Sequence, residues 1–437
     1  MARIFGHCDN CRVPPKIDPP ELADASPALS SVLHEAVREA IKKNGGWIGF
    51  DAFMSVALYA PGLGYYAKGS AQFGMLPADA LKHSRDSTEG SDFATAPEMT
   101  PLFGQTLATQ VAEALQATGT CEVWEFGAGT GALALQILNE MARLQVPISR
   151  YTIVDVSGAL RARQQQRLKA HGDAVRWVDA LPAQMQGVVI GNEVLDAMPV
   201  KLLVRKNRVW FERGVALETL ETFETVEALG ALETFETFDS DAAEKNQPRL
   251  IWSDRETDLR PPVDIPGPHD YLTEIHPQSE AFVRTLADKL TCGAAFFLDY
   301  GFPEAEYYHP QRHMGTVMCH RQHRSDANPL SDVGLKDITA HVNFTGIALA
   351  GQDAGLDVLG YCTQARFLIN CGLLARLENA SLQDKVMAQK LIMEHEMGEL
   401  FKVIGFYKPC ATSTQKQQPS QPWQPVGFAR GDRTHML

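Results

Sequence analysis

The sequence predicts an α/β fold around a mostly parallel sheet, with an N-terminal helical region and an inserted β-hairpin. Between residues 121 and 190, short apolar runs rich in β-branched residues alternate with helical patterns, which is typical of right-handed βαβ units. Three glycines follow the first of these runs, and acidic or amide side chains follow the others. Because the carboxyl ends of parallel strands meet at one edge of a sheet, these residues predict a ligand site there.

The N-terminal part precedes this alternating pattern. Residues 1–27 are rich in proline and predict a flexible tail, and residues 28–94 predict a helical and loop region. Within that region an apolar stripe predicts a helix over about 30–43. The segment "FDAFMSVALYAPGLGYY" (50–66) predicts a short helix that breaks at its proline and continues as a Gly/Tyr loop. A further helix is expected over about 102–118.

The core is expected in two parts, 95–205 and 276–437. The first part predicts strands at 121–126, 150–157, 174–181 and 187–190, with helices at 132–144 and 159–172. The second part predicts a helix at 276–290, strands at 292–301 and 356–363, a helix from Gln364 and a final strand within 396–408. Residues 206–275 interrupt the core and predict a β-hairpin that flanks an acidic, low-complexity loop.

Charge is unevenly distributed along the chain. The net charge is −13, and residues 217–244 hold nine carboxylates and no Lys or Arg. We interpret this near-repeat of "LETFET" as a solvated, dispensable insertion. A nucleic-acid partner usually requires a basic face, so none is expected. No apolar run is long enough to enter a membrane and no signal peptide is recognisable, so we expect a cytoplasmic protein, with the mitochondrial matrix as the alternative.

The cysteines and histidines do not predict a metal site. Cys8 and Cys11 form a C-x-x-C pair without a second pair, and "CHRQH" (319–323) likewise has no matching cluster. Cys121, Cys292 and Cys362 lie in apolar runs and are expected to be small buried residues of a reducing compartment. We therefore predict no metal.

The stretch "VWEFGAGTGAL" predicts a cofactor-binding turn between a strand and a helix. Gly127, Gly129 and Gly131 leave room for a ligand at the backbone, and the following helix N-terminus favours polar groups. Asp155, at the end of the next strand, is placed to hold two ribose hydroxyls. A nicotinamide dinucleotide and S-adenosylmethionine both fit this arrangement.

Three features favour S-adenosylmethionine. Glu125 ends the first strand as an acid, where dinucleotide-binding strands usually stay apolar. The G-x-G-x-G spacing, completed by Gly131, suits a class I (Rossmann-like) methyltransferase sheet. Asp179 ends the third strand, where such enzymes commonly contact the adenine amino group. Asn192, at the end of the fourth strand, is a further candidate for cofactor contact.

The sequence resembles the MidA-like family of S-adenosylmethionine-dependent methyltransferases. The stretches that carry the resemblance run in order from about residue 46 almost to the end: "GFDAFMSVALYAPGLGYY", "SDFATAPEMTPLFG", "WEFGAGTGALA", "GNEVLDAMPV", "FFLDYGFPEAEYYHPQRHMGTVMCHRQHRSDANPL", "GLKDITAHVNFT", "ARFLINCGLL" and "EMGELFKV". The mitochondrial member of the family methylates an arginine of a respiratory complex I subunit. The resemblance therefore implies a protein substrate that presents an arginine.

The stretch "GNEVLDAMP" (191–199) would lie beside the transferred methyl group. It lacks the N-P-P-Y motif typical of DNA amino-methyltransferases and offers carboxylates instead. A guanidinium is cationic and forked, so Glu193 and Asp196 are candidate catalytic residues that grip it, with Asn192 as an orienting partner. In the alternative, structural interpretation, Asp196 caps the following turn and Glu193 binds backbone amides.

Other polar residues rank behind this group. Asp299 and Tyr300 end an apolar strand and are expected to line the same cleft. His320 and His323 are candidate pocket residues or general bases that rank second, because neither has an identifiable partner. The functional alternatives are a cofactor-binding assembly chaperone without catalysis, a methyltransferase acting on a small molecule, and a nicotinamide-dependent oxidoreductase. The last lacks an obvious hydride-transfer site. The sequence does not indicate an oligomeric state.

Overall fold

The computed structural model describes residues 26–67, 95–155, 157–218, 248–321, 324–410 and 423–437. The expected N-terminal tail, apart from its last two residues, and most of the acidic 217–244 insertion lie outside these ranges. His323 lies outside them as well. The description below concerns the described residues only.

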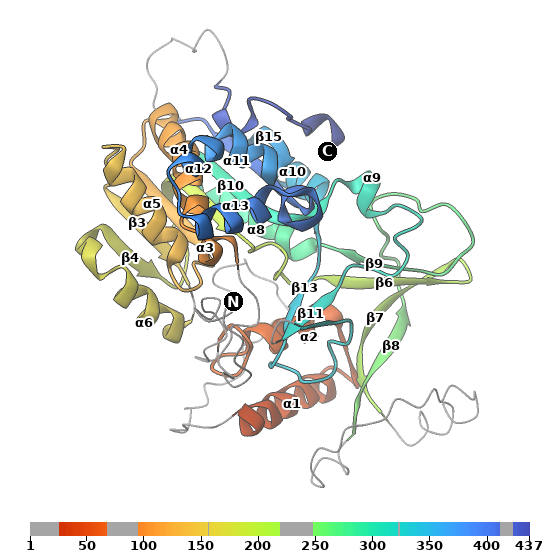
Figure 1. Ribbon diagram of the computed structural model, residues 1–437. Coiled ribbons are helices and arrows are strands. Elements are labelled where there is room, and N and C mark those ends of the chain that lie inside the picture. Colours follow the sequence, from red (N-terminus) through yellow and green to blue (C-terminus); the bar gives the residue numbers. More distant parts are fainter. Residues whose placement is uncertain (1–25, 68–94, 156, 219–247, 322–323, 411–422) are drawn as a thin grey trace.

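A central sheet organises the molecule, in the order β15-β16-β10-β5-β2-β3-β4 (Figure 1). Its strands are β2 (Glu122–Phe126), β3 (Arg150–Val154), β4 (Val175–Val178), β5 (Met185–Asn192), β10 (Leu290–Phe302), β15 (Asp357–Thr363) and β16 (Phe401–Lys408), and the short β14 (Val342–Asn343) pairs with the end of β10. The five strands from β4 to β10 are parallel, while β16 is antiparallel to both of its neighbours. The predicted α/β fold is confirmed.

The order of the strands also indicates where a ligand-binding crevice lies. The chain builds the sheet outward from β2, first through β3 and β4 on one side and then through β5 and β10 on the other. Successive βα connections therefore diverge between β2 and β5. In open α/β sheets, ligands bind at the carboxyl ends of the strands at such a switch point.

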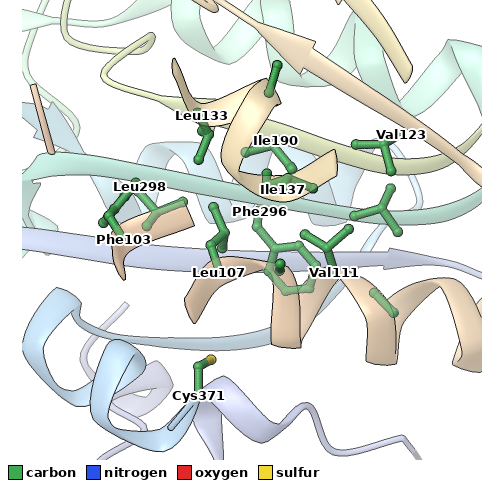
Figure 2. Packing of buried hydrophobic residues seen from close by; sticks show 14 of the residues in the cluster. Phe103, Leu107, Val111, Val123, Leu133, Ile137, Ile190, Phe296, Leu298 and Cys371 are labelled. Carbon is green, nitrogen blue, oxygen red and sulfur yellow. The ribbon is translucent and has the colours of Figure 1, made fainter. Parts of the chain in front are cut away.

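Helices cover both faces of this sheet. One face packs against α4 (Leu102–Thr118), α5 (Ala132–Arg143), α11 (Gln364–Asn370), α12 (Leu373–Glu378) and α13 (Leu382–Ile392), and the other against α8 (Pro277–Lys289) and α10 (Phe344–Asp353). Neighbouring residues of β10 point to opposite faces, so Phe296 joins the first core and Phe297 the second. Figure 2 shows Phe103, Leu107 and Val111 of α4 packing toward the sheet residues of the first core. The helix predicted over 102–118 is confirmed.

A second sheet stands beside the core, in the order β1-β7-β6-β9 with β8 paired to β7 (Figure 1). Its strands are β1 (Trp47–Gly49), β6 (Lys201–Lys206), β7 (Val209–Leu217), β8 (Leu250–Glu256) and β9 (Tyr271–Ile275). Helices α1 (Ser26–Lys43) and α2 (Phe50–Tyr59) share a hydrophobic cluster with this sheet. The hairpin around the acidic segment is thus part of a larger sheet that includes the N-terminal region, and α1 begins earlier than the predicted residue 30.

Smaller elements complete the fold. The three-stranded sheet β12-β11-β13 consists of β11 (Met318–Arg321), β12 (Arg324–Asp326) and β13 (Asp337–Thr339), and the short helices are α3 (Ala96–Met99), α6 (Gly158–Arg167) and α9 (Glu304–Tyr307). In the part of the chain that the structure covers, no helix is long and apolar enough to cross a membrane.

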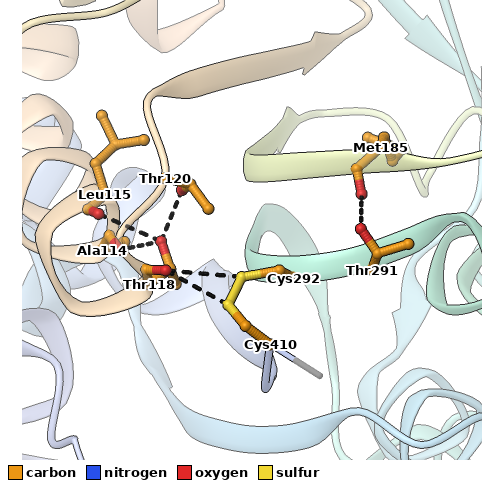
Figure 3. Close-up of a disulfide and its surroundings, with 8 residues drawn as sticks. All are labelled: Ala114, Leu115, Thr118, Thr120, Met185, Thr291, Cys292 and Cys410. Carbon is orange, nitrogen blue, oxygen red and sulfur yellow. Dashed lines mark hydrogen bonds between the residues drawn. A yellow bond between two sulfur atoms is a disulfide. The ribbon is translucent and has the colours of Figure 1, made fainter. Parts of the chain in front are cut away.

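The expectation that three cysteines are small buried residues of a reducing compartment is correct only in part. Cys121 is exposed, and Cys292 is buried but forms a disulfide with Cys410. Figure 3 shows this disulfide. The pairing follows from the antiparallel register, because Gly293 at the start of β10 lies opposite Lys408 at the end of β16. The two cysteines are 118 residues apart in sequence, so only the sheet brings them together. Cys362 is buried and free, as expected.

The C-terminal segment is anchored in the core by one aromatic side chain. Phe428 is 3% exposed, and its ring contacts Phe367 and Phe296 at centroid distances of 5.4 and 6.5 Å. It lies over Gly360 of β15, where a Cβ atom would approach Phe428 Cγ to 2.3 Å. The missing side chain in the strand thus provides the space that the ring fills.

Truncation of this ring should destabilise the whole fold. Because Phe428→Ala leaves a cavity between helix and sheet, we expect a loss of about 3–5 kcal/mol in the free energy of unfolding, measured by urea denaturation. The control is Met436→Ala, at a residue of the same segment that is 36% exposed. Equal, small effects of both changes would show that the segment does not belong to the cooperative core.

Candidate functional site

A cavity of about 830 Å³ opens at the carboxyl edge of the parallel strands. The turns after β2, β3 and β5 form one side of it. The region after α2, helix α3 and the segment around β11 and β13 form the rest. The cavity therefore lies at the predicted switch point of the sheet and receives residues from the central sheet and from the three-stranded sheet.

The glycine turn forms one end of the cavity. Gly127, Gly129 and Gly131 have φ angles of 62°, 51° and 83°, a region that disfavours residues with a Cβ atom. A side chain at Gly127 would also meet Val194, because a Cβ atom would lie 3.0 Å from its Cγ2. Gly127 and Gly129 line the cavity, whereas Gly131 serves as the N-cap residue of α5. The turn thus brings bare backbone to the ligand space.

Glu125 lies beneath this turn and lines the cavity. It is 2% exposed, and Tyr151 donates a hydrogen bond from its hydroxyl to Glu125 Oε2 at 2.7 Å. Burial raises the pKa of Glu125 to about 7, and the nearby charge of Asp155 adds to the increase. A positively charged ligand group at this end would favour its ionised form.

Asp155 follows β3 and lines the same end of the cavity. Its Oδ1 accepts a hydrogen bond from the Ser157 backbone N–H, and its Oδ2 accepts one from Gln164 Nε2, both at 2.8 Å. Asp179 follows β4 but is exposed and is not among the residues that line the cavity. A ribose contact at Asp155 suits this geometry, and the adenine contact at Asp179 stays a prediction.

The turn after β5 lies beside the glycine turn and forms the acidic wall of the cavity. Asn192, Glu193 and Asp196 all line the cavity. Asn192 Nδ2 donates to Glu193 Oε1 at 2.9 Å, and the backbone N–H of Ala96 in α3 donates to the same carboxyl group. Glu193 has a φ angle of 54°, which is uncommon outside glycine and is a conformation that tertiary contacts must hold.

Asp299 holds this turn in place from the neighbouring strand β10. Its Oδ2 accepts hydrogen bonds from the backbone N–H groups of Val194, Leu195 and Asp196 at 3.1, 2.8 and 3.3 Å. Three successive donors around one carboxylate form an anion-binding concavity of backbone groups. Asp299 itself does not line the cavity, so the expectation that it does is wrong, while Tyr300 does line it.

The carboxyl groups near this turn affect one another. Burial raises the pKa of Glu193 to about 8, with the charge of Asp196 as the second cause. Burial also raises the pKa of Asp196 to about 6, against hydrogen bonds from Tyr300 and the backbone N–H of Ala197. Burial and the charges of Asp196 and Glu193 raise the pKa of Asp299 well above its usual value. The site therefore contains more carboxyl groups than can all be ionised near pH 7 in the absence of a cation.

The structural interpretation of the turn is correct only in part. Glu193 does accept a backbone N–H, and Asp196 accepts that of Ala197, but Asp299 is the residue that fixes the turn. Two acceptors in the cavity wall, Asn192 Oδ1 and Asp196 Oδ1, are buried and find no partner among the described residues. No described lysine or arginine forms an ion pair with Glu193 or Asp196. These acceptors suit a ligand that donates several hydrogen bonds and carries positive charge.

The structure also brings in residues that sequence reasoning missed. Tyr59 and Tyr66 line the cavity and stack at a centroid distance of 5.5 Å. Tyr59 donates to the carbonyl of Ala197, and Tyr66 donates to Asp337 Oδ1, both at 2.7 Å. Tyr59 ends α2, and Tyr66 belongs to the Gly/Tyr loop that the sequence predicts, but only the packing of α2 shows that both reach the site.

One of the two histidines that the sequence offered as pocket residues lies in the site, together with a third that it did not offer. His320 lines the cavity, and so does His341, whose ring contacts Tyr300 edge-on at 5.2 Å. Burial lowers the pKa of His341 to about 4, so it is neutral near pH 7. Across the described ranges, no three His, Cys, Asp or Glu side chains form a group that could hold a metal ion.

Helix α3 contacts both ends of the site. Glu98 lines the cavity, pairs with Arg167 of α6 at 2.9 Å and accepts a hydrogen bond from the Thr130 hydroxyl of the glycine turn. Two residues earlier, the backbone N–H of Ala96 binds Glu193. A single helical turn thus joins the glycine turn to the acidic wall.

Residues 106–362, more than half of the chain, match the family model for S-adenosyl-L-methionine-dependent methyltransferases (Methyltransf_28). The chain belongs to this family. The resemblance to MidA-like methyltransferases is thereby confirmed, and the chain is a methyltransferase that uses S-adenosylmethionine.

Relatives of this methyltransferase extend over nearly its full length. It is 43% identical, with a TM-score of 0.79, to a COG1565-superfamily protein from Burkholderia thailandensis crystallised with S-adenosyl-homocysteine, covering 96% of this chain and 100% of that one. It is 23% identical to the mitochondrial protein arginine methyltransferase NDUFAF7 homolog of Caenorhabditis elegans, over 94% of this chain and 93% of that protein. The mitochondrial NDUFAF7 of Danio rerio is 24% identical over 88% and 89%.

The site fits this cofactor. Gly127 and Gly129 expose backbone to the cavity, Glu125 offers an acid near a cationic ligand group, and Asp155 faces the same space. Asn192, whose buried Oδ1 has no partner among the described residues, lines the same cavity. The nicotinamide alternative is wrong, since the family and its cofactor are those of methyl transfer.

Removal of the Asp155 carboxylate should weaken cofactor binding. Asp155→Ala deletes an acceptor for polar ligand hydrogens, so we expect a loss of about 1–3 kcal/mol in the binding free energy of S-adenosylmethionine. Titration calorimetry measures this change. The control is Asp173→Ala, because Asp173 is an exposed acid that precedes β4 and does not line the cavity. Unchanged affinity in Asp155→Ala would exclude Asp155 from the binding site.

The stability of the ligand-free protein should fall as the pH rises. In the folded state the pKa of Glu193 is about 8 and that of Glu125 is about 7, against an ordinary value of 4.5. The folded state thus binds these protons more tightly than the unfolded chain does. Their stabilising contribution is complete below the unfolded pKa and is lost as the pH rises through the folded values.

Glu193→Gln, which is neutral at every pH, should make this decline shallower. The measurement is the Tm of both proteins by calorimetry between about pH 5 and pH 9, without ligand. If the two curves run parallel, Glu193 carries its charge throughout this range and its burial does not raise its pKa.

Proposed function

We propose that this methyltransferase acts on the guanidinium group of an arginine presented by a protein. The observation that carries the proposal is the acidic wall of the cavity, in which Glu193 and Asp196 face the ligand space without a described lysine or arginine as partner. A planar cation with several N–H donors satisfies both the charge and the open acceptors of this wall.

In this proposal, the acidic wall holds and orients the acceptor. Gly127, Gly129 and Asp155 would hold S-adenosylmethionine, which would supply an electrophilic methyl group. Glu193, anchored by Asn192 and Ala96, accepts guanidinium hydrogens and fixes one nitrogen toward that end. Asp196 accepts a second set of hydrogens through its unpartnered Oδ1.

Methylation of a guanidinium also requires the loss of one proton. The attacking nitrogen gains a methyl group and must shed a hydrogen as the product forms. A carboxylate whose pKa is raised to about 8, as for Glu193, is a better proton acceptor than an ordinary glutamate. Tyr66 and Asp337, which are hydrogen-bonded to each other and lie close enough for the charge of Asp337 to raise the pKa of Glu193, provide a second polar contact.

The relatives support the proposed class of substrate by analogy. The mitochondrial relatives are named protein arginine methyltransferases, at 23% and 24% identity. We extend this activity to the present chain and propose a respiratory complex I subunit, or a similar protein, as the substrate. The location that accords with such a substrate is the bacterial cytoplasm or the mitochondrial matrix.

Two other functions keep the same fold. A cofactor-binding assembly chaperone would require no proton acceptor in the cavity, and a small-molecule methyltransferase would use the same acidic wall for a different cation. The raised pKa and strained backbone of Glu193 favour catalysis over a purely structural role. Cofactor binding alone requires neither the raised pKa nor the strained backbone.

Neutralising Glu193 should separate catalysis from cofactor binding. Glu193→Gln keeps the shape and the contact with Asn192 but removes the charge, so we expect turnover to fall about 10²–10³-fold, as for one preorganised electrostatic partner. Cofactor affinity should hold, because the glycine turn and Asp155 are unchanged. The same preparation is assayed by calorimetry and by methylation of an arginine-containing protein fraction, followed by mass spectrometry.

The matched control is Glu256→Gln, at an exposed position of β8 far from the cavity. Normal methylation by Glu193→Gln would make Glu193 a structural residue. Methylation of small cationic compounds, with no modified arginine in any protein, would instead favour the small-molecule alternative.

A further inference from the structure

One buried amide joins the three strand ends that surround the cofactor end of the cavity. Gln164, in α6, is fully buried. Its Nε2 donates to the carbonyl of Gly129 and to Oδ2 of Asp155, both at 2.8 Å, and its Oε1 accepts from Trp177 Nε1 at 2.9 Å. Gly129 follows β2, Asp155 follows β3, and Trp177 lies in β4.

The orientation of this amide is fixed by its partners. A backbone carbonyl can only accept a hydrogen bond, and an indole N–H can only donate one. The nitrogen of Gln164 must therefore face Gly129 and Asp155, and its oxygen must face Trp177. Every hydrogen of the amide nitrogen is used, which leaves no freedom to rotate without losing a bond.

The stem of Gln164 also supports the glycine turn. A Cβ atom at Gly131 would lie 3.4 Å from Gln164 Cγ, so the side chain rests against the end of the turn. The second carboxylate oxygen of Asp155 is held by the backbone N–H of Ser157, at the start of the same helix. Gln164 of helix α6 and Ser157 at its N-cap thus bind both oxygens of Asp155, and Gln164 also binds the backbone of the glycine turn.

We propose that Gln164 is a positioning residue for S-adenosylmethionine, whose amide fixes the direction of the Asp155 carboxylate toward the ribose and its distance from the glycine turn. The proposal rests on the proposed contact between Asp155 and the ribose hydroxyls. Gln164 does not line the cavity, so it acts on the cofactor only through Asp155 and the backbone of Gly129.

The test measures how strongly each variant distinguishes ribose from deoxyribose. The probes are S-adenosyl-homocysteine and its 2′-deoxy counterpart, and the quantity is the ratio of their dissociation constants by titration calorimetry. In the wild type, loss of a hydroxyl that binds a carboxylate should raise the Kd about 10- to 100-fold. Gln164→Met, which keeps length and volume but has no amide, should reduce this ratio to below about 3-fold.

Controls separate positioning from general damage. Gln165→Met changes the exposed neighbour in the same helix and should keep the wild-type ratio. Gln164→Glu is isosteric and keeps an acceptor for Trp177, but it turns acceptors toward Gly129 and Asp155. It should lower the ratio as Gln164→Met does, and it replaces that variant if the methionine form does not fold.

The outcomes are distinct. If both Gln164 variants bind both probes more weakly but keep the wild-type ratio, Gln164 supports the fold only and the proposal is wrong. If the wild-type ratio is near one, or is unchanged in Asp155→Ala, the ribose contact itself is absent and the proposal fails with it. No acceptor enters this experiment, so it is independent of the arginine assignment.

Discussion

The hydrogen bonds from three consecutive backbone N–H groups to Asp299 are the interaction on which the acidic wall depends. They hold the turn after β5 in a shape that gives Glu193 a positive φ angle and directs two carboxyl groups into the cavity. β10 lies beside β5 in parallel register, with Leu298 opposite Asn192, so Asp299 reaches the turn directly. The sheet register is therefore what sets the chemistry of the site.

Placing several carboxyl groups in one buried region is costly in the absence of a cation. The protein meets this cost by proton uptake, which is why the pKa values of Glu193 and Asp196 rise. Backbone and amide donors offset part of the penalty, but they leave individual oxygens without partners. The carboxyl groups and open acceptors that favour a cationic ligand are therefore already in place before the ligand binds.

The sequence predicted the elements whose evidence is local. Helix α4 and the strands around the glycine turn followed from apolar period and glycine spacing, and these patterns do not depend on distant residues. Residues whose position depends on tertiary packing were missed. Tyr59 and Tyr66 reach the cavity only because α2 packs beside the core, and Cys410 meets Cys292 only through the register of β16. For Asp299, the sequence indicated the correct neighbourhood but not that its carboxylate faces the backbone.

Helix α3 gives the two halves of the cavity a shared boundary, since Glu98 contacts the glycine-turn side and Ala96 the acidic side. Thermodynamic linkage makes any influence across such an element mutual. If donor binding at the Glu98 side changes the affinity for the acceptor at the Ala96 side by some factor, the acceptor must change the affinity for the donor by the same factor. The spent cofactor, which lacks the methyl group and its charge, need not have the same effect. One coupling factor thus describes donor and acceptor, and another describes spent cofactor and methylated product. The second factor would determine whether the two products leave independently or promote each other's release.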